Sequence, residues 1–156
     1  MYLHSDALGE RVDERFVYNG YGCHGENLSP PLDWGGAPQE TESFALIVHD
    51  PDAPRPGGWW HWIVFDIPRV VHRIPEGAGA FLRELGAVES VTSFGTPGYG
   101  GPCPPVGHGP HRYVFSVFAM PRARLPLRPD TSPAVADAWI REHALDSASL
   151  ISHYQR

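Results

Sequence analysis

The chain has 156 residues, 42% of them hydrophobic and 19% charged, which excludes a disordered chain and fits one domain over residues 1–156. Its formal net charge of −6 and the lack of any basic run disfavour nucleic acid as a partner. Lysine is absent, which excludes Schiff-base catalysis and a P-loop.

Glycine, proline and cysteine usage indicates a turn-rich protein of a reducing compartment. The 17 glycines and 17 prolines follow no repeat period, so they predict many turns. Cys23 and Cys103 form no CxxC pair, and we expect both to be reduced thiols. The N-terminal residues do not have the pattern of a signal peptide, and no apolar run reaches about 18 residues. We therefore predict a cytoplasmic protein without a transmembrane segment.

Three segments have strong strand patterns. Phe44–His49 reads FALIVH, a nearly continuous apolar run that is typical of a strand covered on both faces. His61–Ile67 (HWIVFDI) and His111–Met120 (HRYVFSVFAM) are rich in aromatic and β-branched residues. Weaker strand patterns occur at residues 16–19, 87–93 and 149–154.

Two segments have helical patterns. A short helix is predicted at Ala80–Leu85, between glycines. A clearer one follows Ser132 as N-cap, with Pro133 at the favoured first position. Together the elements predict a mainly β protein, an antiparallel β-sandwich with one or two peripheral α-helices.

Two aspartates, Asp50 and Asp52, follow the first strong strand in the motif HDPDAP. Their position at the end of a buried strand places two carboxylates at the rim of the core. An Asx-type turn, in which they accept hydrogen bonds from nearby backbone N–H groups, explains the motif equally well.

A histidine lies among three tryptophans in the second motif, GGWWHWIVF. Strand alternation predicts that Trp60 and Trp62 share one face and that Trp59 and His61 share the other. A core histidine with one satisfied hydrogen bond is the alternative interpretation of His61. The two glycines before the tryptophans indicate that the backbone passes close to another group.

The third motif, GGPCPPVGHGPHRYVF, joins a proline-rich loop to a strand. Prolines without an N–H stiffen the loop, and His111 and Tyr113 lie on one face of the strand that follows. Alternatively the loop is only a long crossover and Tyr113 an ordinary strand aromatic.

Together with FVYNGYGCHGENLSPPLDW, these motifs resemble the bacterial branch of the phosphatidylethanolamine-binding protein family, also called the Raf kinase inhibitor protein family. The resemblance covers nearly the whole chain. It implies a Greek-key β-sandwich with a small pocket for phosphate, carboxylate or phospholipid-headgroup-like anions. The pocket residues that it implies are Asp50, Asp52, Pro54, Trp59, His61, Pro104, Pro105, His111 and Tyr113.

The resemblance also implies cis peptide bonds at Ala53–Pro54 and Gly58–Trp59. Many relatives carry a lysine where this chain has Val106, so one positive charge at the pocket mouth is missing, and we expect His108 to replace it in part. No base is evident beside Cys103, which favours a structural role for it over a nucleophilic one.

The leading hypothesis is a binding or regulatory protein for a small anionic or phosphorylated ligand, without a cofactor, because no nucleophile or cofactor motif is recognised. The alternative is an enzyme acting on a small carbonyl or carboxylate metabolite. Asp50 and His61 would then be base and acid, and His111 with Tyr113 would stabilise negative charge.

Three further expectations concern partners. A metal site formed by His108, His111 and the aspartates is disfavoured, because a loop-to-strand junction need not bring the two imidazoles together. Protease or kinase inhibition, which eukaryotic relatives show, involves no motif residue. The resemblance to bacterial relatives implies a homodimer.

Overall fold

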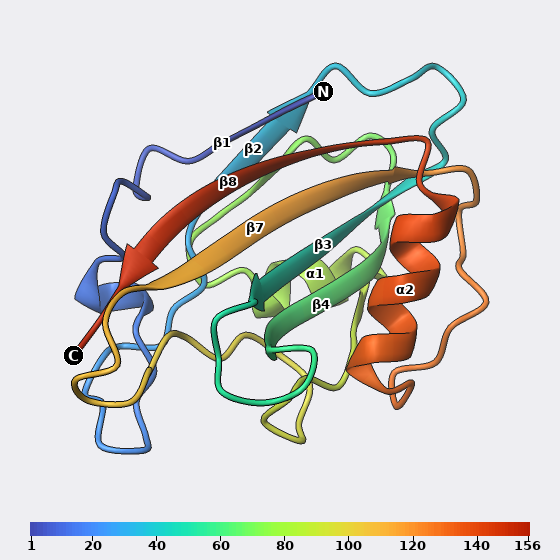
Figure 1. Ribbon diagram of the computed structural model, residues 1–156. Helices are drawn as coiled ribbons and strands as arrows, with labels where there is room; N and C mark the ends of the chain where they lie inside the picture. The colour runs from blue at the N-terminus through green and yellow to red at the C-terminus, as the bar shows by residue number, and fades with distance from the viewer.

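The structure is a computed structural model that describes residues 1–156, and it contains two antiparallel β-sheets with few helices (Figure 1). The strands of the small sheet, in spatial order, are β1 (Tyr2–His4), β2 (Leu32–Gly35) and β5 (Arg73–Ile74). Those of the large sheet are β6 (Val88–Glu89), β4 (Trp59–Pro68), β3 (Ser43–Asp50), β7 (His111–Met120) and β8 (Asp146–Tyr154). The predicted mainly β fold is confirmed.

The central strand β3 is buried on both faces. Phe44, Leu46 and Val48 lie in the core between the two sheets, whereas Ala45 and Ile47 lie in a second core beneath a helix. Successive side chains of a strand point to opposite faces, so both sets must be apolar. This two-sided burial explains the continuous apolar run FALIVH.

Three helical segments complete the fold: η1 (Glu14–Phe16), α1 (Gly79–Glu84) and α2 (Pro133–His143). The helix α2 begins at Pro133 after Ser132, as predicted, and packs beside β4 (Figure 1). Its buried Asp137 accepts hydrogen bonds from the indole N–H of Trp60 and from Nε of Arg141. No helix is long and apolar enough to cross a membrane.

The weaker predictions had mixed outcomes. Residues 17–19 do not form a strand, and only Val88–Glu89 of residues 87–93 do. The last strand begins at Asp146, three residues before the predicted start. The short strands β1, β2 and β5 were not predicted.

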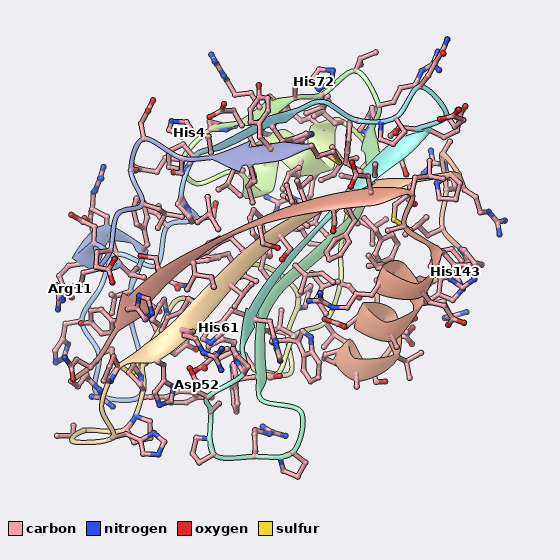
Figure 2. The ribbon with its side chains drawn as sticks, turned by 45° about the horizontal axis from the view of Figure 1, so that its top comes forward. His4, Arg11, Asp52, His61, His72 and His143 are labelled. Atoms are coloured by element: carbon pink, nitrogen blue, oxygen red, sulfur yellow. A yellow bond between two sulfur atoms is a disulfide. The ribbon has the colours of Figure 1, made fainter.

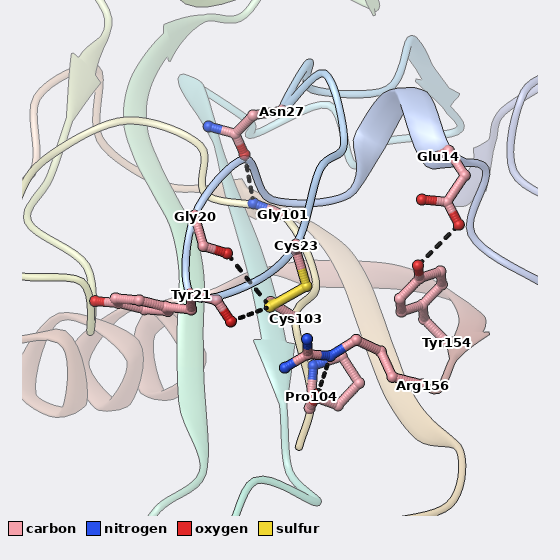
Figure 3. The surroundings of a disulfide bond; sticks show 10 residues. All are labelled: Glu14, Gly20, Tyr21, Cys23, Asn27, Gly101, Cys103, Pro104, Tyr154 and Arg156. Atoms are coloured by element: carbon pink, nitrogen blue, oxygen red, sulfur yellow. Dashed lines mark hydrogen bonds between the residues drawn. A yellow bond between two sulfur atoms is a disulfide. The ribbon is translucent and has the colours of Figure 1, made fainter. Parts of the chain in front are cut away.

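Cys23 and Cys103 form a disulfide, so the prediction of two reduced thiols is wrong (Figure 3). Their Cα atoms are 6.0 Å apart although 80 positions separate them in the chain. The bond ties the loop between η1 and β2 to the proline-rich loop before β7. The oxidised sulfur of Cys103 has no proton, so its 3.5 Å approach to the carbonyl oxygen of Gly20 is a contact and not a hydrogen bond.

Replacing both cysteines with serine should lower the free energy of unfolding by about 2 to 5 kcal/mol, because the disulfide closes a long loop in the unfolded chain. Urea denaturation of the wild type, with and without dithiothreitol, measures the effect. Dithiothreitol should bring the wild type to the level of the C23S/C103S variant and leave that variant unchanged. Equal midpoints in all four samples would show that the disulfide contributes nothing to stability.

Candidate functional site

A cavity of about 290 Å³ lies where β3 ends and β4 and β7 begin. Because β3 is antiparallel to both neighbours, its last residue lies beside their first residues. The lining residues are Tyr21, Asp50, Ala53, Pro54, Arg55, Trp59, His61, Phe94, Cys103, Pro104, Pro105, His111 and Tyr113.

Eight of the nine residues assigned to a pocket from the sequence line this one cavity. The exception is Asp52. Its carboxylate instead accepts hydrogen bonds from the backbone N–H, Nε and Nη2 of Arg112, at 2.8, 3.0 and 2.8 Å. These bonds lower the pKa of Asp52 to about 2. Asp52 therefore anchors the loop after β3 to β7 from outside the cavity.

Asp50 is 3% exposed and uses both carboxylate oxygens. Its Oδ1 accepts the backbone N–H of Asp52 at 2.8 Å, and its Oδ2 lies 2.6 Å from Nδ1 of His111. The Asx-type turn is therefore present, and of the two aspartates only Asp50 lines the cavity. A carboxylate accepts but does not donate, so His111 carries a proton on Nδ1.

The second ring nitrogen of His111 is also engaged. Its Nε2 lies 2.6 Å from Nδ1 of His108, an exposed residue of the proline-rich loop. Both ring nitrogens of His111 therefore have protein partners. The side chain of Val106 is 76% exposed and does not line the cavity.

A β-bulge at the start of β4 aims His61 into the cavity. Val48 pairs with Trp62 and His49 with Trp60, which leaves His61 without a partner on β3. A bulge of this kind reverses the alternation of the strand. Trp60 accordingly packs toward α2 and Trp62 toward the core between the sheets, so the prediction that they share a face is wrong.

His61 is a neutral hydrogen-bond acceptor toward the cavity. Its Nδ1 donates to the carbonyl oxygen of Gly100 at 2.7 Å, which leaves Nε2 unprotonated and without a protein partner. Burial lowers the pKa of His61 to about 4, against the opposing effect of Gly100 and Asp50. A neutral His61 does not fit the role of acid that the enzyme hypothesis gave it. The ring lies edge-on to Tyr113, with centroids 5.2 Å apart.

Burial, with a contribution from the Asp50 carboxylate, raises the pKa of Tyr113, so its phenol keeps its proton. The phenol is therefore a donor beside the acceptor nitrogen of His61. Figure 2 shows His61 inside the protein near the end of the large sheet.

Aromatic side chains and one cation form the rim. Phe94 stacks on Tyr18 at 4.5 Å and lies edge-on to Trp59 at 5.2 Å. The guanidinium of Arg55 lies over the ring of Trp59, 4.8 Å from its centroid. Nothing in the sequence marked Tyr21, Phe94 or Arg55, because separate loops bring them to the cavity. Cys103, which forms the disulfide with Cys23, also lines the cavity.

The structure contains no cis peptide bond, so both cis bonds that the resemblance implied are trans. The chain turns instead at Gly57 and Gly58, with φ values of +79° and +78°. A Cβ at Gly58 would lie 2.3 Å from the carbonyl oxygen of Asp50, which confirms the predicted close approach of the backbone. No three His, Cys, Asp or Glu side chains are grouped to hold a metal ion.

Gly58→Ala should destabilise the protein more than Gly86→Ala. Both glycines have φ near +80°, where a Cβ costs about 1 to 2 kcal/mol, but Gly86 has open space around it and Gly58 does not. The difference between the two free energies of unfolding therefore reports the clash with Asp50. Equal losses would show that the backbone moves away without cost.

His61 should make stability depend on pH. Its pKa is about 4 in the folded protein and about 6.5 in the unfolded chain, so protonation below pH 6.5 favours the unfolded state. The wild type should lose about 3 kcal/mol more than His61→Asn between pH 7 and pH 4. Asparagine keeps a donor for Gly100 but does not titrate. Urea denaturation at each pH measures both proteins, and parallel profiles would contradict the neutral state of His61.

Comparison with known proteins identifies the family. A family model named for phosphatidylethanolamine-binding protein matches residues 6–155. YbcL of Escherichia coli is 39% identical over 150 residues, which cover 94% of this chain and 82% of YbcL. YbhB of the same organism is 38% identical over 148 residues, which cover 94% of this chain and 93% of YbhB. The crystal structure of E. coli YbcL, a member of the mammalian PEBP family, matches with a TM-score of 0.93 over 99% of this chain and 98% of that one, at 38% identity. The chain therefore belongs to the phosphatidylethanolamine-binding protein family.

Proposed function

We propose that this protein binds a small anion in the cavity lined by Asp50, His61, His111 and Tyr113, and acts as a ligand-binding regulatory protein. The family is named for binding phosphatidylethanolamine, whose headgroup carries a phosphate. The observation that carries the proposal is the pairing of a free acceptor, Nε2 of His61, with nearby donors in one cavity.

The arrangement favours an anion that also carries a proton. Nε2 of His61 accepts an O–H, while the guanidinium of Arg55 and the phenol of Tyr113 supply donors. A phosphate or phosphate monoester in its singly protonated form offers both groups. The apolar surfaces of Trp59, Phe94 and Pro105 would contact a nonpolar substituent.

An acid–base enzyme remains the second candidate, with a changed role for His61, because a neutral imidazole whose Nε2 has no protein partner can accept a proton but cannot be the predicted acid. Exchange of the methyl protons of pyruvate with deuterium oxide, followed by proton NMR, would reveal such activity. Exchange that is lost in His61→Asn would favour this candidate over simple binding.

The cytoplasmic location, the homodimer and kinase or protease inhibition remain predictions. The disulfide bears on the first of them, since disulfides persist mainly in oxidising compartments. It therefore argues against the reducing environment from which the location was inferred.

Inorganic phosphate at pH 7 should shift the ring signals of His61 and His111 saturably at millimolar concentration. His4 and His143, which lie far from His61 in Figure 2, serve as internal references and should not shift. Arg55→Gln should weaken binding about 5- to 10-fold by removing a charge-assisted hydrogen bond at an exposed rim. Arg69→Gln, an exposed arginine outside the cavity, is the matched control. Equal small shifts of all four histidines would contradict a specific site.

A further inference from the structure

His108 occupies the only nitrogen through which His111 can reach a ligand. Nδ1 of His111 is committed to Asp50 at 2.6 Å, so a ligand can accept a hydrogen bond only from Nε2. That atom lies 2.6 Å from Nδ1 of His108. Because Nε2 has a single proton or lone pair, His108 and an anion compete for it.

Of the two histidines, His108 is the one free to move. His111 is 2% exposed and belongs to β7, whereas His108 is exposed on the loop between Gly107 and Gly109. A Cβ at either glycine would meet no atom within 4 Å. The backbone N–H of Gly107 still bonds the carbonyl oxygen of Arg156, so the side chain of His108 can turn away while the loop stays attached.

We propose that His108 is a gate, meaning a side chain that must release His111 before an anion can bind there. This proposal rests on the proposed anion site and adds a way in which anion binding is regulated. With the gate closed, the anion competes with the hydrogen bond between the two imidazoles. With the gate open, Nε2 of His111 is available to the cavity.

Acid opens this gate. The two facing nitrogens share one proton, so the bond forms when either ring is neutral. When both rings are protonated, two N–H groups face each other and two positive charges repel.

Other charged groups lie near the pair. Asp50, at the end of β3, accepts a hydrogen bond from His111, and Asp52 adds a second carboxylate whose charge Arg112 balances. Other titratable or charged groups on neighbouring elements include Arg55, His61, Tyr113, His153, Tyr154 and Arg156.

Titration with inorganic phosphate at pH 8, 7, 6 and 5 tests the gate in the wild type, His108→Ala and His108→Asn. Ratios of dissociation constants at one pH cancel the titration of phosphate itself. At pH 8 His108→Ala should bind about 3- to 10-fold more tightly than the wild type, the range expected for one lost hydrogen bond. At an acidic pH at which the hydrogen bond between the two rings is lost, the wild type should bind at least as tightly as His108→Ala.

The asparagine variant separates the effect of the hydrogen bond to His111 from the effect of a charge on His108. Its amide reaches the position of Nδ1 and does not titrate, so His108→Asn should match the wild type at pH 8 and bind more weakly at the acidic pH that opens the gate in the wild type. The scalar coupling between Nδ1 of His108 and Nε2 of His111 reports the closed gate directly, and should vanish on acidification and at saturating phosphate. His4→Ala, a remote exposed histidine, is the control and should behave like the wild type.

The outcomes distinguish the two proposals. Equal or weaker phosphate binding by His108→Ala at pH 8, or a coupling that persists at saturating phosphate, overturns the gate but leaves the anion site standing. If neither the wild type nor His108→Ala binds phosphate saturably, the anion site itself is wrong and the gate falls with it. Circular dichroism establishes that each variant is folded.

Discussion

The hydrogen bond between Asp50 and His111 is the interaction on which the rest of the site depends. It joins the last residue of β3 to the first residue of β7, and both side chains are buried. Since no arginine pairs with Asp50, the imidazole is its main compensation for burial. The same bond fixes the tautomer of His111 and leaves Nε2 as its one variable contact. This tautomer therefore determines which nitrogen of His111 contacts His108 and which hydrogen-bond donors are available to the cavity.

Irregular backbone, rather than regular strand geometry, brings the other groups to Asp50. The bulge at His61 takes that side chain out of the alternation of β4 and directs it toward Tyr113. The turn at Gly58 lets the start of β4 pass within contact of the Asp50 carbonyl. The disulfide then holds the loop that carries Tyr21 against the proline-rich loop (Figure 3). Three separate constraints on the backbone therefore meet at the same end of the sheet.

Features that depend on the local sequence were predicted, whereas features that depend on contacts between residues distant in the chain were not. β3, β4 and β7 were predictable because each is long and strongly apolar, whereas β1, β2 and β5 have only two to four residues and exist through pairing. The motif residues of the site were predictable because strand ends carry them. The bulge, the disulfide and the contact between His108 and His111 depend on partners in space. Phe94 and Arg55 reach the cavity in the same way, so no local pattern marks them.

The protonation states of Asp50 and His61 limit which anions can bind in the cavity. Asp50 already places a buried negative charge at the cavity, and His61 has lost its ability to balance it, because burial lowers the pKa of this histidine to about 4. A fully ionised anion would therefore meet repulsion that only the exposed Arg55 offsets, in a medium that screens charge poorly. A proton must accompany the anion. The ligand itself can carry this proton to Nε2 of His61, which is unprotonated and has no protein partner.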